Sequence, residues 1–461
     1  MIMPGSAVNP EELVRLDREY MWHHMMQHKL FELQEPVIMV EGKGCMVKDV
    51  HGREYLDGVS GGVWCINVGY GQDSIAEAVY EQLKRMPYYA GSAGNPPSVL
   101  LAQKLITLLP YLQRVFLSNS GSEANEKAFK ISRQYNRLKY PGKDRYKIIY
   151  RDRDYHGTTL AALSATGQSE RKMGYEPLVP GFMGIPPVYC YRCSFGKTYP
   201  GCDIACARAL ENLILSQGPD TVAAVILEPI TAGGGIIVPV DEYFEVIQQI
   251  CQKYEILLVM DEVVCGFGRT GKMFGHQHWN VSPDMITAAK GIASSYMPLS
   301  ATITTQKIFE VFLNDPGDKM SYFRDISTYG GSAGAAAAAL ENIRIIEDQK
   351  LCENSEKMGG YLLERLKELK GFPAVGDVRG KGLFAGVELV EDKNNRVPAS
   401  EHFVAKVVSL VARQGVLVGK MTRSIPDQNN VITMAPPLII TRDEIDRIVD
   451  SMRKALEEAI K

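Results

Sequence analysis

The sequence lacks an excess of charge of either sign, and it lacks long apolar runs. Lys and Arg number 51 and Asp and Glu number 54 among 461 residues, so the net charge is −3. This balance gives no electrostatic reason to expect a nucleic-acid partner. No stretch approaches the roughly 18 consecutive apolar residues of a membrane span. The first thirty residues also lack a charged start followed by an apolar core, and we therefore expect a cytoplasmic protein that does not bind a membrane.

Cysteine is also sparse, with 9 residues in the chain, which is typical of reduced thiols rather than of a disulfide framework. Four of them form a C-x2-C-x8-C-x3-C pattern at Cys190, Cys193, Cys202 and Cys206. Such a set could bind zinc, but the central gap is shorter than the roughly 15 to 20 residues between zinc-ribbon pairs. We expect no metal there, and the length of the chain predicts two or three domains.

Two short apolar runs end in ionisable side chains of the kind that take part in catalysis. Residues 256–260 are expected to form a buried strand of a parallel sheet, and Asp261 follows at its end. A second run, residues 285–289, ends in Lys290. Ligands of open α/β sheets lie beyond the carboxyl ends of the strands, so both side chains are expected to face a ligand. The ordinary alternative is that Asp261 caps a turn and Lys290 is a surface lysine.

An acid and a lysine at strand ends are the pair that pyridoxal phosphate chemistry needs. The lysine bonds the aldehyde of the cofactor, and burial can shift its pKa from about 10.4 toward ~7 to 8, where it also moves protons. The acid keeps the pyridine nitrogen protonated, so that the ring accepts electrons. We therefore predict Lys290 and Asp261 as the catalytic residues.

Residues 266–271 match the G-x-G-x-x-G pattern of nicotinamide-binding proteins. That motif must open a helix packed on the sheet, whereas residues 272–283 contain His, Trp, Asn and Pro without a helical apolar stripe. We interpret the glycines as a loop that passes close to the cofactor or to a neighbouring subunit. A nicotinamide oxidoreductase stays the alternative from a different class of enzyme.

A group of small residues lies between an expected strand, residues 114–117, and an expected helix. The six residues from Ser120 to Asn125 read SGSEAN. Free backbone N–H groups and the positive end of a helix make such a place suited to a phosphate. An ordinary helix cap formed by Ser122 and Asn125 is the alternative.

The strings LEPITAGGG, MDEVVCGFGRTG, AAKGIA and SGSEAN resemble the class III (ω-amino acid) aminotransferases, which belong to the fold type I pyridoxal phosphate enzymes. The resemblance extends from Gly42 to the last helix. It implies an α/β fold whose large domain has a mostly parallel sheet flanked by helices, with a smaller α+β domain. We expect an N-terminal segment at 1–65 that joins the small domain, the large cofactor-binding domain at 66–335 and the small domain at 336–461. A mutase or a decarboxylase on the same fold stays open.

The resemblance also implies roles for single residues. Lys290 would hold pyridoxal phosphate, Asp261 would face its ring nitrogen, and the aromatic residue of the YHG motif, Tyr155, would stack on the ring. Thr328 would reach across a homodimer interface to the cofactor phosphate of the other subunit, although Gly330 and the residues after it depart from the family's TYSGHP pattern. The full set of expected cofactor-binding residues is Ser120, Gly121, Ser122, Tyr155, His156, Glu228, Asp261, Val263, Lys290 and Thr328.

The expected substrates are a small amine donor and an oxo-acid acceptor. Trp64 and Tyr20 are candidates for the wall of the substrate pocket. In the family an arginine near the C-terminal end binds the anionic group. Arg423 is our candidate and Lys420 the alternative, because a guanidinium fork suits a carboxylate or sulfonate better than an ammonium group does.

Residues 23–29 and 59–71 and the cysteine cluster most resemble family members that transfer the amino group of taurine to pyruvate. This reaction would give sulfoacetaldehyde and L-alanine. The alternative donors are β-alanine, 4-aminobutyrate or a diamine. The resemblance further implies a homodimer with active sites at its interface, or a tetramer built from such dimers.

Overall fold

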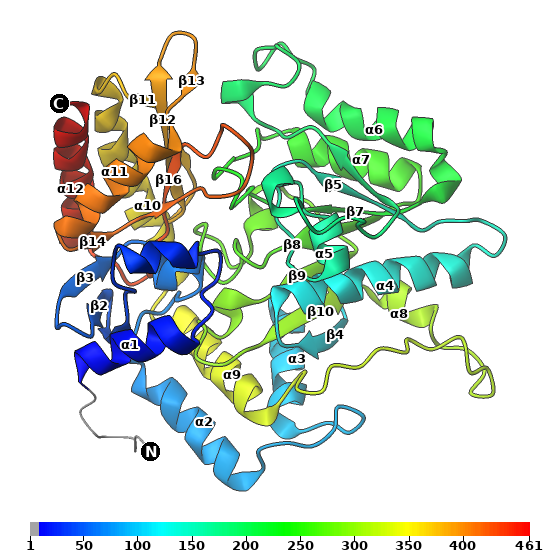
Figure 1. The fold of residues 1–461 in the computed structure, drawn as a ribbon. Coiled ribbons are helices and arrows are strands. Elements are labelled where there is room, and N and C mark those ends of the chain that lie inside the picture. The colour runs from blue at the N-terminus through cyan, green and yellow to red at the C-terminus, as the bar shows by residue number, and fades with distance from the viewer. Residues whose placement is uncertain (1–8) are drawn as a thin grey trace.

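A computed structural model describes residues 9–461 (Figure 1). Its central sheet has seven strands in the order β4-β10-β9-β8-β7-β5-β6. The strands are β4 (Arg114–Ser118), β5 (Lys147–Arg151), β6 (Phe182–Ile185), β7 (Val222–Leu227), β8 (Leu257–Asp261), β9 (Met285–Ala288) and β10 (Ser300–Thr304). Only β10 pairs antiparallel, with β4 on one side and β9 on the other. The prediction of a mostly parallel sheet is confirmed.

Helices cover both faces of this sheet. The helices of this part of the chain are α2 (Asp73–Arg85), α3 (Pro96–Leu108), α4 (Gly121–Lys139), α5 (Leu160–Ser164), α6 (Ala205–Gln217), α7 (Tyr243–Lys253), α8 (Gln306–Glu310) and α9 (Ala333–Asp348). In Figure 1, α6 and α7 lie on one side of the sheet and α4 on the other. The strands β7 and β8 are buried along their whole length, which explains their continuous apolar sequences.

Alternate residues of the central strands enter two different cores. Val225 and Leu258 belong to the core that includes Ile247 of α7, whereas Val259 belongs to the core that includes Phe129 of α4. This alternation is the two-residue period of a strand. The sheet is therefore fixed in register from both faces, and the residues at its strand ends are held in defined positions.

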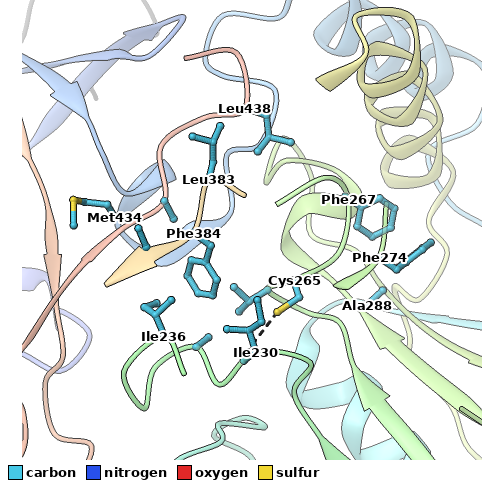
Figure 2. Packing of buried hydrophobic residues seen from close by; sticks show 14 of the residues in the cluster. Ile230, Ile236, Cys265, Phe267, Phe274, Ala288, Leu383, Phe384, Met434 and Leu438 are labelled. Carbon is cyan, nitrogen blue, oxygen red and sulfur yellow. Dashed lines mark hydrogen bonds between the residues drawn. The ribbon is translucent and has the colours of Figure 1, made fainter. Parts of the chain in front are cut away.

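The C-terminal part forms a second, mainly antiparallel sheet. Its strands are β11 (Val375–Gly380), β12 (Ala385–Asp392), β13 (Val397–Pro398), β15 (Gly419–Lys420) and β16 (Val431–Met434). The helices beside it are α10 (Leu351–Lys367), α11 (Glu401–Arg413) and α12 (Arg442–Ile460). Figure 2 shows Leu383, Phe384 and Leu438 of this part opposite Ile230 and Cys265, which lie in the loops after β7 and β8. One apolar core therefore continues between the two parts.

The N-terminal segment begins with α1 (Pro10–Tyr20) and continues into the expected antiparallel meander, β1 (Met39–Lys43), β2 (Met46–Asp49) and β3 (Glu54–Asp57). Strand β3 also pairs in parallel with β14 (Val416–Leu417) from the C-terminal part. This pairing supports the proposal that residues 1–65 join the small domain of residues 336–461, beside the large domain of 66–335. The first eight residues of that segment lie outside the described part of the chain.

None of the helices between residues 9 and 461 combines the length and the apolar character needed to cross a bilayer.

Candidate active site

A cavity of about 410 Å³ lies where β7, β8 and β9 end. All the expected cofactor-binding residues except Thr328 line it. They are Ser120, Gly121, Ser122, Tyr155, His156, Glu228, Asp261, Val263 and Lys290. Side chains that are up to 170 residues apart in sequence, such as Ser120 and Lys290, therefore share one space because the ends of several strands converge there.

Asp261 is the most constrained group of the cavity, with only 2% of its surface exposed. Its Oδ2 accepts hydrogen bonds from Asn125 Nδ2 and His156 Nδ1, both at 2.8 Å. Its Oδ1 accepts one from the backbone N–H of Val263 at 3.0 Å. Donors on both oxygens stabilise the ionised carboxylate and fix its orientation. Asp261 is therefore a rigid anion on the floor of the cavity.

Lys290 lies two residues after the end of β9 and begins a short 3₁₀ turn, Lys290–Ile292. Its φ is +46°, a left-handed conformation that typically costs about 1 to 2 kcal/mol for a residue with a side chain. Burial lowers the pKa of Lys290, and the nearby Asp261 carboxylate opposes that shift. A strained, partly desolvated lysine of this kind is suited to bonding an aldehyde and to moving protons.

The next residue shows how tightly this turn is packed. A Cβ on Gly291 would lie 2.4 Å from Asn67 Nδ2, so a larger residue would displace the turn that carries Lys290.

Glu228, at the end of β7, holds the backbone of Tyr155. Its Oε1 accepts the Tyr155 N–H at 2.8 Å, and its Oε2 accepts the Ala232 N–H at 3.2 Å. Burial, together with nearby Asp154 and Asp261, raises the pKa of Glu228 well above its usual range. These surroundings therefore favour the protonated form of Glu228.

The Tyr155 ring forms part of the cavity wall and is supported by a cation. The guanidinium carbon of Arg171 lies 4.8 Å from the ring centroid, and Arg171 Nε donates to Gln168 Oε1 at 2.5 Å. A guanidinium over an aromatic face stabilises the ring in place by about 0.5 to 2 kcal/mol. Tyr155 is thus fixed through both its backbone and its ring.

The N-terminus of α4 opens into the same cavity. Ser120 caps this helix, because its Oγ accepts the N–H of Glu123 at 3.2 Å. The ordinary alternative, a cap formed by Ser122 and Asn125, is therefore wrong. Ser122 Oγ accepts the N–H of Thr158 at 3.1 Å, which leaves its own hydroxyl hydrogen available. The free N–H groups of the first helical turn and this hydroxyl can bind an anion.

Thr328 does not line the cavity and is exposed to solvent. The preceding residue ties its segment to the α4 N-terminus, because Ser327 Oγ donates to Glu123 Oε2 at 2.6 Å and accepts from Asn119 Nδ2 at 3.0 Å. A Cβ on Gly330 would lie 2.4 Å from the Leu117 carbonyl oxygen, which explains the glycine at that position. Contact between Thr328 and a second subunit stays a prediction.

The three expected substrate residues lie outside the lining of the cavity. Trp64 packs edge-on against Phe384 at 5.6 Å, while its neighbours Val63 and Cys65 reach the cavity. Tyr20, the last residue of α1, is 72% exposed. Arg423 is exposed on the loop after β15. Their substrate roles therefore stay predictions, and so does the alternative role of Lys420.

The Arg423 loop is nevertheless tied to the segment that supports Tyr155. The Ser424 carbonyl oxygen accepts the Glu170 N–H at 3.2 Å, and Asn429 Nδ2 donates to Glu170 Oε2 at 2.7 Å. Glu170 directly precedes Arg171, whose guanidinium lies on the Tyr155 ring. The loop therefore reaches the neighbourhood of the cavity.

Two residues of the site were not predicted from the sequence. Asn125 binds Asp261, and Thr287 Oγ1 in turn donates to Asn125 Oδ1 at 2.7 Å. The spacing of four between Gly121 and Asn125 places both on one helix face, and this signal could have identified Asn125. No local signal identifies Arg171, because its contact with Tyr155 depends on how a loop folds back.

The glycine loop at 266–271 does not open a helix. It runs through turns to a single 3₁₀ turn, Gly275–His278, so the nicotinamide interpretation is wrong. An approach of its glycines to the cofactor or to another subunit stays a prediction. A Cβ on Gly268 would lie 2.7 Å from Leu438, and one on Gly271 would lie 3.1 Å from Glu356, so these glycines allow close packing on the C-terminal part.

The cysteine cluster does not form a metal site in the structure. All nine cysteines are free, and residues 9–461 contain no group of three or more His, Cys, Asp or Glu side chains arranged around a common point.

The groups that line the cavity fit pyridoxal phosphate. A Cβ on Gly121 would lie 3.0 Å from Val263 Cγ1 and Cγ2, so glycine keeps open the space at the α4 N-terminus that a phosphate needs. Asp261 can accept an N–H from a pyridine ring, and Lys290 can bond an aldehyde. Among the described residues, the buried His156 Nε2 also lacks a hydrogen-bond partner.

Fold and cavity together define a fold type I pyridoxal phosphate enzyme. The family model for class III aminotransferases matches residues 31–456. The chain belongs to this family and is an aminotransferase.

Among its relatives, the taurine–pyruvate aminotransferase of Bilophila wadsworthia is 53% identical over 445 residues, which cover 96% of either chain. The hypotaurine/taurine–pyruvate aminotransferase of Paracoccus denitrificans is 49% identical and covers 97% of this chain and 98% of its own. A crystal structure of a Bacillus anthracis aminotransferase superposes with a TM-score of 0.93 at 42% identity, covering 97% of this chain and 98% of that one.

Proposed function

We propose that this aminotransferase uses pyridoxal 5'-phosphate to transfer the amino group of taurine to pyruvate, giving sulfoacetaldehyde and L-alanine. The use of this cofactor is supported by one observation, the cavity in which Asp261, Lys290 and the α4 N-terminus meet. The choice of donor and acceptor is supported by the two relatives with these substrates in their names, at 53% and 49% identity.

We propose the following roles for single residues of this site. The N–H groups and hydroxyls at Ser120, Gly121 and Ser122 bind the phosphate, and Thr328 of a second subunit completes its shell. Tyr155 and Val263 enclose the ring, which Asp261 holds by accepting its N–H. His156 and Glu228 fix Asp261 and Tyr155 in place.

When bound, pyridoxal phosphate supplies an aldehyde that takes up the amino group and a ring that withdraws electrons. Lys290 Nζ removes the proton from the amino-bearing carbon of the donor and returns a proton in the second half of the reaction. Its lowered pKa increases the fraction of neutral amine that can do so. The Asp261 carboxylate would accept the N–H of the ring nitrogen and hold the proton there.

Both substrates carry an anionic group, which we assign to Arg423. This arginine forms no ion pair with other described residues, so its fork is free to bind sulfonate or carboxylate. Trp64 and Tyr20 complete the pocket in this proposal, and Lys420 is the alternative cation.

We also propose a cytoplasmic homodimer with the active sites at its interface, or a tetramer of such dimers. Three large apolar side chains are strongly exposed, Trp22 at 88%, Leu33 at 86% and Ile326 at 85%. Such a set of exposed apolar groups is typical of a protein interface. Analytical ultracentrifugation tests this proposal, because a monomer at micromolar concentration would contradict it.

Coupled turnover tests the proposed reaction. Alanine formed from pyruvate is measured with taurine, β-alanine, 4-aminobutyrate and putrescine as donors at equal concentration. We expect the highest kcat/KM with taurine. Turnover of another donor without turnover of taurine would reject the proposed donor, and no alanine with any donor would reject the acceptor.

A further inference from the structure

A second cavity, of about 1040 Å³, shares no lining residue with the active-site cavity. It lies between the cysteine cluster, the turn after β12 and the loop after β15. Its charged lining residues are Arg153, Arg192, Lys197, Arg396 and Asp152. Four cations and one acid therefore face a space large enough for a small organic molecule.

Arg153 is the central observation, because it is only 8% exposed and has no carboxylate partner among the described residues. Its guanidinium donates to the Gly234 carbonyl oxygen and to Gln428 Oε1, and it lies 5.1 Å from the Tyr189 ring centroid. Burial lowers the pKa of Arg153. The carboxylates of Glu388 and Asp152 lie close enough to act on this cation but form no ion pair with it. An anion in the cavity would stabilise it further.

Two further arginines are held in place on a different aromatic ring. The guanidinium carbons of Arg192 and Arg396 lie 5.4 and 5.0 Å from the Tyr191 ring centroid. Arg192 Nε pairs with Glu388 at 2.6 Å, but its buried Nη2 has no partner among the described residues. Arg396 donates to the Tyr191 carbonyl oxygen and is in no ion pair of the described chain. Both forks are thus oriented before any ligand binds.

The neighbouring acids neutralise these cations only in part. Glu388 already pairs with Arg379 at 2.7 Å as well as with Arg192, and Arg379 also contacts Asp377. Asp152 lines the cavity itself, but burial raises its pKa to about 6, which reduces its average charge near neutral pH. The cavity therefore keeps an excess of positive charge.

We propose that this second cavity binds a small oligoanion that carries two or more phosphate groups. Guanidinium forks match phosphate oxygens in pairs, and three of the four cations lack a carboxylate within the described chain. The hydroxyl residues Ser169, Ser194 and Thr198 add hydrogen-bonding groups to the wall. The volume exceeds what a single monoanion would fill.

Calorimetric titration of the holoenzyme with pyrophosphate tests the proposal, at constant ionic strength set with sodium chloride. We expect one saturable site per chain. Arg153→Gln should weaken binding at least tenfold, and Arg396→Ser should weaken it severalfold. Lys253→Ser is the matched control: its side chain is 62% exposed and pairs with Glu211 outside the cavity, so binding should not change.

Absence of a saturable site would overturn the proposal, as would equal weakening by Lys253→Ser and Arg396→Ser, which indicates general screening of surface charge. Loss of the cofactor's visible absorbance during the titration would also overturn it, because pyrophosphate would then occupy the α4 N-terminus. If Arg153→Gln does not fold, the titration of Arg396→Ser still tests the proposal, because Arg396 is exposed.

Discussion

The floor and the rim of the active site are built in different ways. The floor consists of Asp261, the last residue of β8, and of Glu228 and Lys290, which come after β7 and β9. The residues that we propose for the rim, Arg423 and Thr328, are exposed on loops and do not line the cavity. The carboxylates of the floor accept hydrogen bonds from backbone N–H groups, whereas within residues 9–461 the side chains of Arg423 and Thr328 have no partners of that kind.

This difference indicates that the floor residues serve the chemical reaction and that the proposed rim residues serve substrate selection. Groups fixed at strand ends cannot move without disturbing the sheet, so the floor is suited to chemistry that needs a constant geometry. Exposed loop residues can adapt to two substrates of different shape, or wait for a second subunit. We therefore expect substitutions of the floor to lower kcat and substitutions of the rim to raise KM.

The largest effect is expected from Lys290→Ala. Without this amine the floor has neither the group that bonds the aldehyde nor the base that moves the proton, and turnover should fall below detection. Turnover is measured as the rate of alanine formation from taurine and pyruvate. The control Lys454→Ala, an exposed lysine of α12, should keep full activity. Residual turnover within tenfold of the unsubstituted enzyme would refute the role of Lys290.

Asp261→Asn should have the next largest effect. The amide keeps the size of the carboxylate but cannot hold a proton on the ring nitrogen, so we expect kcat to fall on the order of 10³-fold with the cofactor still bound. Glu228→Gln is the matched control. Burial raises the pKa of Glu228, so the neutral amide is a milder change at this position, and the loss should stay below tenfold. Equal losses in the two variants would remove the distinction between these acids.

Arg423→Met tests the rim. Loss of the guanidinium fork should raise KM for taurine and pyruvate about 10- to 100-fold, which corresponds to about 1.4 to 2.7 kcal/mol, while kcat changes little. KM for putrescine, a donor without an anionic group, should change less. Lys420→Met is the control, and a larger rise in KM for that variant would transfer the anion-binding role to Lys420.

The smallest effect is expected from Ser327→Ala, which loosens the rim where it meets α4. Removal of the 2.6 Å hydrogen bond to Glu123 should lower the free energy of unfolding by about 1 to 2 kcal/mol. Urea unfolding at fixed protein concentration measures this. Ser216→Ala, at an exposed helix end, should cost at most about 0.5 kcal/mol. No difference between the two would show that the contact does not hold the Thr328 segment.

The sequence predicted the floor better than the rim, for a physical reason. The apolar runs that end in Asp261 and Lys290 show within a few residues where two strands end. Parallel strands bring such ends to one edge of a sheet. The alternation of strands and helices likewise predicted the mostly parallel sheet. The single antiparallel strand, β10, was not predicted, because strand direction depends on pairing and not on local pattern.

Contacts between distant parts of the chain could not be predicted in the same way. Trp64 lies against Phe384, 320 residues further along the chain, and Arg171 lies on Tyr155 because a loop folds back. The glycines at 268 and 271 resembled a nucleotide-binding loop but serve close packing on Leu438 and Glu356. Each of these contacts depends on the tertiary arrangement, which no short sequence window contains.

The central claim is that Lys290 forms the covalent attachment to the cofactor. Borohydride reduction of the holoenzyme, followed by proteolysis and mass spectrometry of the modified peptide, tests it most directly. The account predicts a single pyridoxyl-modified lysine, at position 290. A modification at any other lysine, or an unmodified chain that retains its cofactor absorbance before reduction, would contradict it.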